Sequence, residues 1–239
     1  MPNYFIDSSC VNGRICSITG NDFYHLMRVR RVSKGDALTL VDENSRCFSA
    51  LVEDILPECI ICSVELMESA GERPFQLCLY AALLKGKKFD LVIRKAVETG
   101  IHRIVPVITE RCIVDYSEKA GVKNTRWRRI AEEAAKQSLR RQVPDVTDIR
   151  AFDDVIYDKW DERIIAHVDG DDFKMYARSV IHPRSAAVIV GPEGGFSESE
   201  LEAAEKAGWK RLALSFPQMR AETAAIVTSA LMTYEWGSG

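Results

Sequence analysis

The chain of 239 residues has no apolar run that approaches the ~18 residues needed to span a membrane. Its first residues, MPNYFIDSS, also lack the basic and apolar segments of a secretory leader. These two absences predict a cytoplasmic protein without a membrane partner. The composition, 46% hydrophobic and 28% charged, is ordinary for a globular chain that can bury a core.

Cysteine patterns for a disulfide framework or a zinc site are missing as well. The seven cysteines are an odd number, and a chain of this size does not need disulfides. Cys59 and Cys62 form a single C-x-x-C in a β-like run, without the second pair that a zinc site requires. We predict reduced, mostly buried thiols and no metal.

The net charge of −3 is unevenly distributed along the chain. Residues 72–150 hold 17 Lys and Arg against 10 Asp and Glu, whereas the segments on either side are acidic. A local basic block is typical of proteins that bind an acidic polymer, although a solvated helix face also explains such charges.

A polar segment around Gly71 and Pro74 divides the chain into two predicted domains. Residues 1–71 read as a small β domain, and residues 72–239 as an α/β domain in which strands and helices alternate. Apolar strands without alternation, such as AAVIV, are typical of a parallel sheet covered on both faces. We see no internal repeat.

The predicted elements follow from this pattern. In the first domain a helix is expected at 21–31 and strands at 37–42, 47–55 and 59–67. In the second, strands are expected at 75–83, 103–108, 163–168, 186–190 and 211–214, and helices at 89–99, 124–141, 152–157, 197–207 and 221–236.

The stretch AAVIVGPEGGFSESE, residues 186–200, places a glycine-rich loop between a buried strand and a helix. Ser197 and Glu200 form an S-x-x-E capping box, so the helix should begin directly after the loop. The loop is neither G-x-G-x-x-G nor G-x-x-x-x-G-K-[ST], and Glu193 would repel a polyphosphate. An adenosine with a positive centre suits it better, although a tight turn without a ligand also fits.

A second loop, LSFPQMRAETAA at residues 214–225, leaves the last strand. Neighbouring parallel strands release their loops at the same edge of a sheet, so both loops are expected to line one crevice. Arg220 stands at the start of the final helix, where an arginine gains nothing from the helix dipole. This placement favours a functional arginine, with a structural ion pair to an acidic neighbour as the alternative.

The helix expected at 124–141 has a basic side opposite an apolar one. At about 100° per residue, four cations fall within an arc of roughly 80°. They are Arg126, Arg129, Lys136 and Arg140. A solvated face on which Glu133 pairs with Arg129 is the alternative interpretation.

Together these motifs resemble the small-subunit (16S) ribosomal RNA uridine-N3 methyltransferase family, a branch of the SPOUT superfamily. GPEGGFSESE and LSFPQMRAETAAIVTSALM are similar to its two C-terminal motifs, and KGKKFDLVIRKAVETGIHRIVPVITERC, residues 85–112, agrees as well. The resemblance covers nearly the whole length and includes His25 and Arg28. Ser215, Pro217 and Ala221 depart from the family pattern in the last loop.

The resemblance implies a PUA-like β-barrel followed by an α/β SPOUT methyltransferase domain with a C-terminal trefoil knot, working as a homodimer. It implies S-adenosyl-L-methionine as cofactor and 16S ribosomal RNA, free or in the small ribosomal subunit, as partner. The cofactor-binding residues carried over are His167, Val168, Gly191, Glu193, Gly194, Gly195, Leu214, Ser215 and Met219. The RNA-binding residues are His25, Arg28, Arg30, Arg31, Arg126, Arg129, Lys136 and Arg140.

The implied reaction is methylation of N3 of one uridine, without a metal. Loss of the N3 proton leaves negative charge on the uracil, and a permanently charged guanidinium suits such an anion. Arg220 is therefore expected to orient and stabilise the uracil. Glu222 either accepts the proton or holds Arg220.

Three other functions stay open on the sequence alone. A SPOUT methyltransferase for another RNA nucleotide would carry similar loops, and so would a non-catalytic RNA-binding assembly factor that keeps the knot. A Rossmann-type nucleotide enzyme is disfavoured by Glu193 and by the missing glycine fingerprint.

Overall fold

A computed structural model describes residues 3–42, 46–67, 75–113, 120–138, 140, 142–181 and 183–237. The chain folds into a smaller unit, residues 1–72 with 135–142, and a larger unit, residues 73–134 with 143–239. The predicted boundary between residues 71 and 72 lies outside the described residues. Residues 135–142 group with the smaller unit, where Lys136 Nζ lies 3.2 Å from Asp22 Oδ1.

The smaller unit is built on one six-stranded sheet in the order β1-β4-β5-β6-β3-β2. Three strands occur where they were predicted, and three short ones, which have too few residues to show an alternating pattern, extend the sheet on both sides. Only the β1–β4 pair is parallel among the strands described. The strands are β1 (Asn3–Ile6), β2 (Val11–Asn12), β3 (Ile15–Ile18), β4 (Ala37–Asp42), β5 (Cys47–Leu56) and β6 (Cys59–Leu66).

The helix predicted at 21–31 is present but changes its winding. It begins as α1 (Gly20–His25) and continues as a π-helical turn over Leu26–Arg30. The N–H of Arg31 bonds to the carbonyl of Leu26, and Arg31 itself takes the left-handed conformation with φ 52°. Phe23 of α1 and Leu26 of the π-helical turn are both buried in the core of this unit.

All seven cysteines are free thiols, and four of them are buried. Cys16 and Cys62 face each other across β3 and β6. Burial raises the pKa of Cys62 to about 11 and that of Cys16 to about 12. Because a reactive cysteine needs a low pKa, the C-x-x-C motif has the character of core packing.

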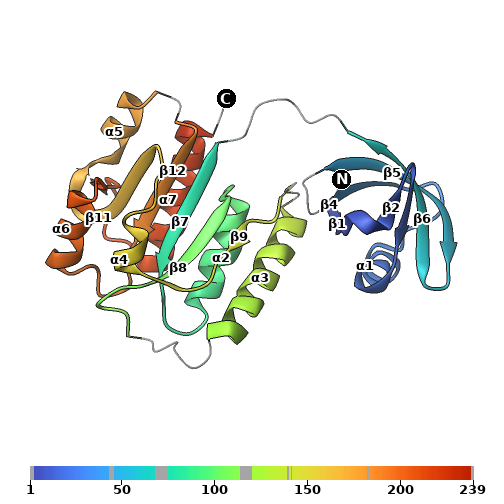
Figure 1. The fold of residues 1–239 in the computed structure, drawn as a ribbon, viewed down its shortest axis with the longest axis horizontal. Helices are drawn as coiled ribbons and strands as arrows, with labels where there is room; N and C mark the ends of the chain where they lie inside the picture. Colours follow the sequence, from blue (N-terminus) through green and yellow to red (C-terminus); the bar gives the residue numbers. More distant parts are fainter. Residues whose placement is uncertain are drawn as a thin grey trace. The chain divides into compact units, whose positions relative to one another are not determined.

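The larger unit contains one parallel sheet in the order β10-β8-β7-β12-β11-β13, with β9 beside β8 (Figure 1). Its strands are β7 (Gln76–Ala82), β8 (Arg103–Ile108), β9 (Asp145–Val146), β10 (Arg150–Ala151), β11 (Glu162–Asp172), β12 (Ser185–Val190) and β13 (Lys210–Ala213). The helices are α2 (Lys88–Glu98), α3 (Ala120–Gln137), α4 (Phe152–Val155), α5 (Phe173–Ser179), α6 (Glu198–Lys206) and α7 (Ala221–Trp236). The sequence predicted every one of these helices except α5.

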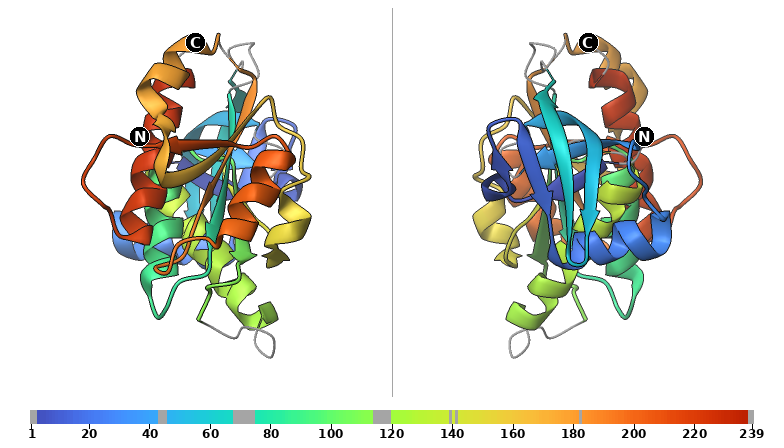
Figure 2. Two further views of the ribbon diagram at one scale, coloured as in Figure 1. Left: turned by 90° about the vertical axis from the view of Figure 1, so that its left-hand side faces the viewer. Right: turned by 90° about the vertical axis from the view of Figure 1, so that its right-hand side faces the viewer.

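Helices cover both faces of this sheet, as the apolar strands predicted. Helices α2 and α7 lie together on one face, and α4 and α6 lie on the other (Figure 2). The five residues 186–190 of β12 are all buried for this reason. The carboxyl ends of β7, β8, β12 and β13 therefore release their loops at one edge of the sheet.

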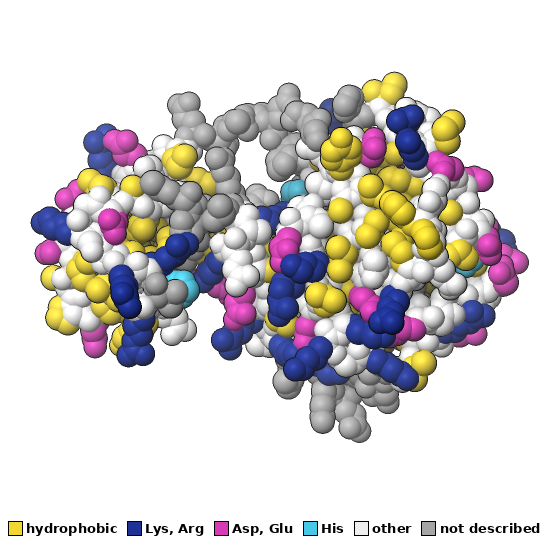
Figure 3. Space-filling view, turned by 180° about the vertical axis from the view of Figure 1, so that it is seen from behind, with side chains coloured by type: hydrophobic (Ala, Val, Ile, Leu, Met, Phe, Trp, Pro, Cys, Tyr) yellow, Lys and Arg dark blue, Asp and Glu magenta, His cyan; other side chains and the backbone are white. Residues whose placement is uncertain are grey.

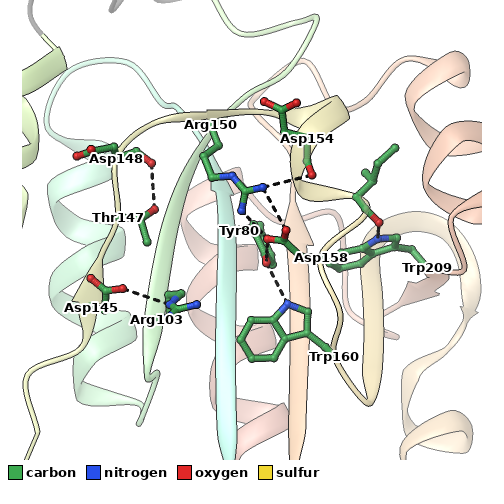
Figure 4. Close-up of polar contacts among 11 residues, drawn as sticks. Tyr80, Arg103, Asp145, Thr147, Asp148, Arg150, Asp154, Asp158, Trp160 and Trp209 are labelled. Carbon is green, nitrogen blue, oxygen red and sulfur yellow. Dashed lines mark hydrogen bonds and ion pairs between the residues drawn. The ribbon is translucent and has the colours of Figure 1, made fainter.

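A polar network ties the segment before β11 to the sheet (Figure 4). Tyr80 of β7 donates to Asp158 Oδ2 at 2.6 Å and accepts the indole N–H of Trp160 at 3.0 Å. Arg150 binds both carboxylate oxygens of Asp158, at 2.5 and 3.1 Å. The hydrogen bonds from Arg150 and Tyr80 outweigh partial burial and hold the pKa of Asp158 below its usual range.

Helix α3 ends earlier than predicted, at Gln137. The N–H of Arg140 bonds to the carbonyl of Ala135, which closes a wider turn than a helical bond. The placement of Arg140 on the basic helix face was therefore wrong, because the residue lies beyond the helix.

Two features are absent from the residues that the structure describes. No helix among them is both long and apolar enough to cross a membrane. No group of three or more His, Cys, Asp or Glu among them is arranged to hold a metal ion.

Candidate functional site

A pocket of about 750 Å³ opens at the carboxyl edge of the parallel sheet. Three stretches of chain form most of its wall: residues 166–168, 190–196 and 212–221. The two loops that were expected to share a crevice do line one pocket. Its volume lies within the range of sites that hold a small molecule.

The glycine-rich loop after β12 needs its glycines for two different reasons. Gly195 has φ +69°, a conformation that other residues rarely adopt. A Cβ on Gly191 would lie 3.0 Å from the ring of Phe196, so a side chain there would displace a buried aromatic. The predicted capping box is present between Ser197 and Glu200, and α6 begins at Glu198.

A bulge in β11 forms the second wall. Ala166 and Asp171 both pair with Leu212 of β13, so residues 167–170 are left out of the ladder. Within this bulge a Cβ on Gly170 would lie 2.6 Å from the backbone of Leu212. The bulge explains how the predicted residues His167 and Val168 reach the pocket.

The loop after β13 forms the third wall and includes the predicted residues Leu214, Ser215 and Met219. Ser215 Oγ donates to Asp172 Oδ2 at 2.5 Å, and Asp172 also caps α5. The loop is thereby fastened to the end of β11 as well as to its own strand.

Arg220 is the N-cap residue of α7 and lines the pocket. Its guanidinium is exposed and forms no ion pair with any residue that the structure describes. The structural ion pair considered as an alternative for Arg220 is therefore absent within the described chain. A permanent cation without a protein partner is available to a ligand.

Glu222 lies two residues further on but faces differently. It is 9% exposed, and its Oε2 has no hydrogen-bond partner among the described residues. It does not line the pocket, and no ion pair joins it to Arg220. The holding role considered for Glu222 has no contact to support it in this conformation.

Two charged residues of the pocket were not among those predicted. Lys88, the first residue of α2, places Nζ 2.8 Å from Glu193 Oε1. Arg111, in the loop after β8, donates from Nη1 to the carbonyl of Gly194 at 3.0 Å. Both residues follow neighbouring strands of the sheet, and strand order would have placed their loops at the same edge.

The Lys88–Glu193 pair sets the local electrostatics. The hydrogen bond that Lys88 donates to Glu193 raises the pKa of Lys88. For Glu193, some desolvation is outweighed by hydrogen bonds from Lys88 and the backbone of Lys85, which lower its pKa. Both groups are charged at neutral pH, so Glu193 carries its charge on the pocket wall next to a cation.

Glu200 joins the loop after β8 to the glycine-rich loop. Its Oε1 accepts the N–H of Glu110 at 2.8 Å, and its Oε2 accepts the N–H of Ser197 at 2.9 Å. The carboxylate is buried, with 8% of the residue exposed. One side chain therefore caps α6 and aligns two walls of the pocket.

The predicted RNA-binding residues are divided between the two units. His25, Arg28, Arg30 and Arg31 are exposed on the smaller unit, together with the half-buried Lys136 and Arg140. Burial lowers the pKa of Arg140 to about 10, so it stays charged at neutral pH.

The two remaining residues lie on the part of α3 that belongs to the larger unit. Arg126 is paired with Asp90, and Arg129 with Glu133 at 3.1 Å. The pairing of Arg129 is the one that the solvated-face interpretation expected.

Comparison with known proteins places these features in a family. Residues 71–233 match the family described as RNA methyltransferase domain. Ribosomal RNA small subunit methyltransferase E of Bacillus subtilis is 27% identical, with 98% of this chain and 97% of that protein covered. The protein of the same name from Aquifex aeolicus is 30% identical, with 87% and 90% covered.

A solved structure agrees at the level of the fold. Ribosomal RNA small subunit methyltransferase E from Neisseria gonorrhoeae, bound to S-adenosyl methionine, superposes with a TM-score of 0.86 at 27% identity. The comparison covers 99% of this chain and 98% of that one. The predicted methyltransferase-like α/β fold is therefore confirmed.

Proposed function

The chain belongs to the RNA methyltransferase family, and within it to the ribosomal RNA small subunit methyltransferase E proteins; on this premise we propose that it methylates N3 of one uridine in 16S ribosomal RNA. The observation that carries the proposal is the pocket in which the glycine-rich loop, the β11 bulge and the last loop meet beside the unpaired Arg220.

S-adenosylmethionine is the methyl donor in this proposal, and when bound it supplies an electrophilic methyl group on a sulfonium. The residues fit such a ligand, because glycines at 191, 194 and 195 let a flat adenosine approach the backbone closely. Residues 167–168, Leu214, Ser215 and Met219 complete the binding wall in our assignment.

Arg220 is assigned to the uracil. N3 of uridine becomes a nucleophile only when it loses its proton, and the charge then spreads over the ring and its carbonyl oxygens. A guanidinium presents a planar fork of donors that can pair with such an anion and fix its orientation. The exposed position at the pocket and the absence of an ion pair in the described chain suit this role.

Glu222 is the second residue of the predicted catalytic pair. A buried carboxylate oxygen without a partner is costly, so its Oε2 is a site where a water molecule or a rearranged Arg220 would be favourable. We assign Glu222 to this pair because it lies two residues after Arg220 in sequence, in the first turn of α7.

The RNA is held in this proposal by cations on both units. Residues 1–71 are assigned as a PUA-like β-barrel, supported by the six-stranded, mainly antiparallel sheet with four exposed basic or imidazole side chains. The phosphate contacts of such a surface are sensitive to salt and nearly independent of the base sequence.

Because N3 is occupied in a Watson–Crick pair, the target uridine must be unpaired. A ribosomal RNA substrate also places the protein in the cytoplasm.

A trefoil knot and a homodimer belong to the same proposal. The insertion of β13 beside β11, with Gly170 against the backbone of Leu212, supports a threaded C-terminal segment. Helix α7 supports the dimer, because its outward side is apolar where a monomer would expose polar residues (Figure 3). The partly or fully exposed residues of that side are Ile226, Val227, Ala230, Leu231 and Tyr234.

Replacement of Arg220 by alanine tests the proposed function. We expect methylation of small ribosomal subunits to be abolished while calorimetry with S-adenosylmethionine gives an affinity within several-fold of wild type. Arg184→Ala, an exposed arginine outside this pocket, is the matched control and should keep full activity.

Mass spectrometry of ribosomal RNA from a deletion strain identifies the modified position. Loss of methylation at another RNA nucleotide would favour a different RNA methyltransferase. A well-folded protein that binds no S-adenosylmethionine would favour an assembly factor.

A further inference from the structure

The loop between β7 and α2, together with the first residue of α2, carries three lysines, one of which lines the pocket. Its sequence is Lys85-Gly86-Lys87-Lys88, and we call residues 85–88 the lysine loop. Gly86 between them has φ +64°, a left-handed conformation that glycine adopts more readily than other residues. Lys88 lines the pocket itself, and Lys85 and Lys87 are exposed.

Glu193 fastens this loop to the glycine-rich loop. Its carboxylate accepts a hydrogen bond from Nζ of Lys88 at 2.8 Å and another from the backbone of Lys85. The contact joins chain segments 105 residues apart in sequence. The acidic residue that made the glycine-rich loop unsuited to polyphosphate therefore has a protein partner, and its position fixes that of the lysine loop.

The charges of the lysine loop are not balanced by the fold. Glu193 accounts for Lys88, but neither Lys85 nor Lys87 has an ion pair within the part of the chain that the structure describes. Other lysines on the described surface do form ion pairs, such as Lys95 with Glu98 and Lys206 with Glu202. Cations at the start of a helix also oppose its dipole, so this cluster does not serve the stability of α2.

Electrostatics connects the loop to the residues assigned to chemistry. Both Glu222 and Arg220 act on the charge of Lys88, the first favouring it and the second opposing it. Lys85 and Lys87 stand three residues and one residue before Lys88 in the chain, so their charges are tethered to a residue that lines the pocket. A nucleotide that enters this pocket carries its own phosphate groups to the rim.

We propose that Lys85 and Lys87 form a binding site for the phosphates that flank the target uridine, held in place by the contact of Glu193 with the lysine loop. The proposal rests on the proposed function of the same pocket. It assigns the site an RNA ligand recognised by charge alone, so that it contributes affinity and register without reading the base sequence.

The test compares Lys85→Ala/Lys87→Ala with the control Lys159→Ala/Lys206→Ala. The control lysines are exposed and lie outside the pocket. The substrate is small ribosomal subunits from a strain that lacks this protein. KM for subunits, kcat and the dependence of kcat/KM on salt are measured for each variant, and calorimetry gives the affinity for S-adenosylmethionine.

We expect the loop variant to raise KM for subunits several-fold with kcat and cofactor affinity unchanged. Each lost phosphate contact reduces the slope of log affinity against log salt by about 0.7 to 0.9, so two should reduce it by about 1.4 to 1.8. The control should match wild type. An unchanged KM and slope, or an equal loss of cofactor affinity, would overturn the proposal.

Failure of the proposed function gives a different result. Wild-type protein would then leave the subunits unmethylated, whatever the lysines do. The salt dependence of subunit binding by wild type and by the loop variant still tests the lysine loop in that case, because it needs no turnover.

Discussion

Replacing Glu200 by alanine is the most direct test of how the pocket is assembled. The Glu200 carboxylate caps α6 through Ser197 and accepts the N–H of Glu110 from the loop after β8. That loop continues into Arg111, which holds the carbonyl of Gly194. A single truncation should therefore loosen two walls at once.

The expected loss of stability follows from these hydrogen bonds. Removal of a helix cap costs about 1 kcal/mol. A buried N–H left without an acceptor costs about 1–3 kcal/mol, and the exposure of Glu110 places its N–H at the lower end. The sum is about 2–3 kcal/mol, which in a unit of this size corresponds to a fall in Tm of roughly 4–12 °C.

Differential scanning calorimetry measures this change, with and without S-adenosylmethionine. Glu198→Ala is the matched control, because it removes the same charge from the same helix turn without a hydrogen bond to another loop. Only the dipole contribution of about 0.3–1 kcal/mol should be lost there. Affinity for S-adenosylmethionine should fall in the Glu200 variant and hold in the control. Equal Tm values for the two variants would refute the reasoning.

Two further predictions concern the larger unit. Gly170→Ala should destabilise it by about 1–3 kcal/mol or more, because the new Cβ would lie 2.6 Å from the Leu212 backbone, which cannot move aside as a side chain can. Denaturant unfolding measures this loss, and a variant as stable as wild type would contradict the close approach. Asp158→Asn should destabilise the protein most at pH values above the ordinary pKa of aspartate. Because the pKa of Asp158 is lowered in the folded state, the ionised carboxylate stabilises the fold there, and this stability is lost as the pH falls through the folded-state pKa. Tm measured from pH 7 downward should show the two proteins converging, and a constant difference would exclude this linkage.

The sequence predicted those elements in which several residues show the same structural preference. The apolar strand residues 186–190 and the amphipathic helices specify a covered parallel sheet, and Ser197 with Glu200 specifies the start of α6. Short elements carry too few residues for a pattern, so β2, β9 and β10, of two residues each, were missed. The end of α3 was misplaced because its basic spacing continues past Gln137 in sequence while the backbone turns away.

The residues that line the pocket could be predicted only as far as the order of the strands in the sheet could be predicted. Two loops in one crevice follow from parallel strands, whereas the inclusion of Lys88 and Arg111 depends on β7 and β8 lying next to β12. Pairings between distant charges, such as Lys88 with Glu193, leave no periodic signal in sequence. The bulge at residues 167–170 is likewise set by tertiary pairing with β13 and not by local preference.

Two residues of the last loop that depart from the pattern of the resemblance, Ser215 and Ala221, have definite contacts in the structure. The hydroxyl of Ser215 donates to Asp172 at 2.5 Å. Because Asp172 also caps α5, the added hydrogen bond couples the loop to a second helix. Ala221 is buried at the first turn of α7, where its small apolar side chain packs without needing a hydrogen-bond partner. Arg220, which lies between Ser215 and Ala221 in sequence, is the N-cap of α7 and lines the pocket, so both residues support the segment that carries this cation.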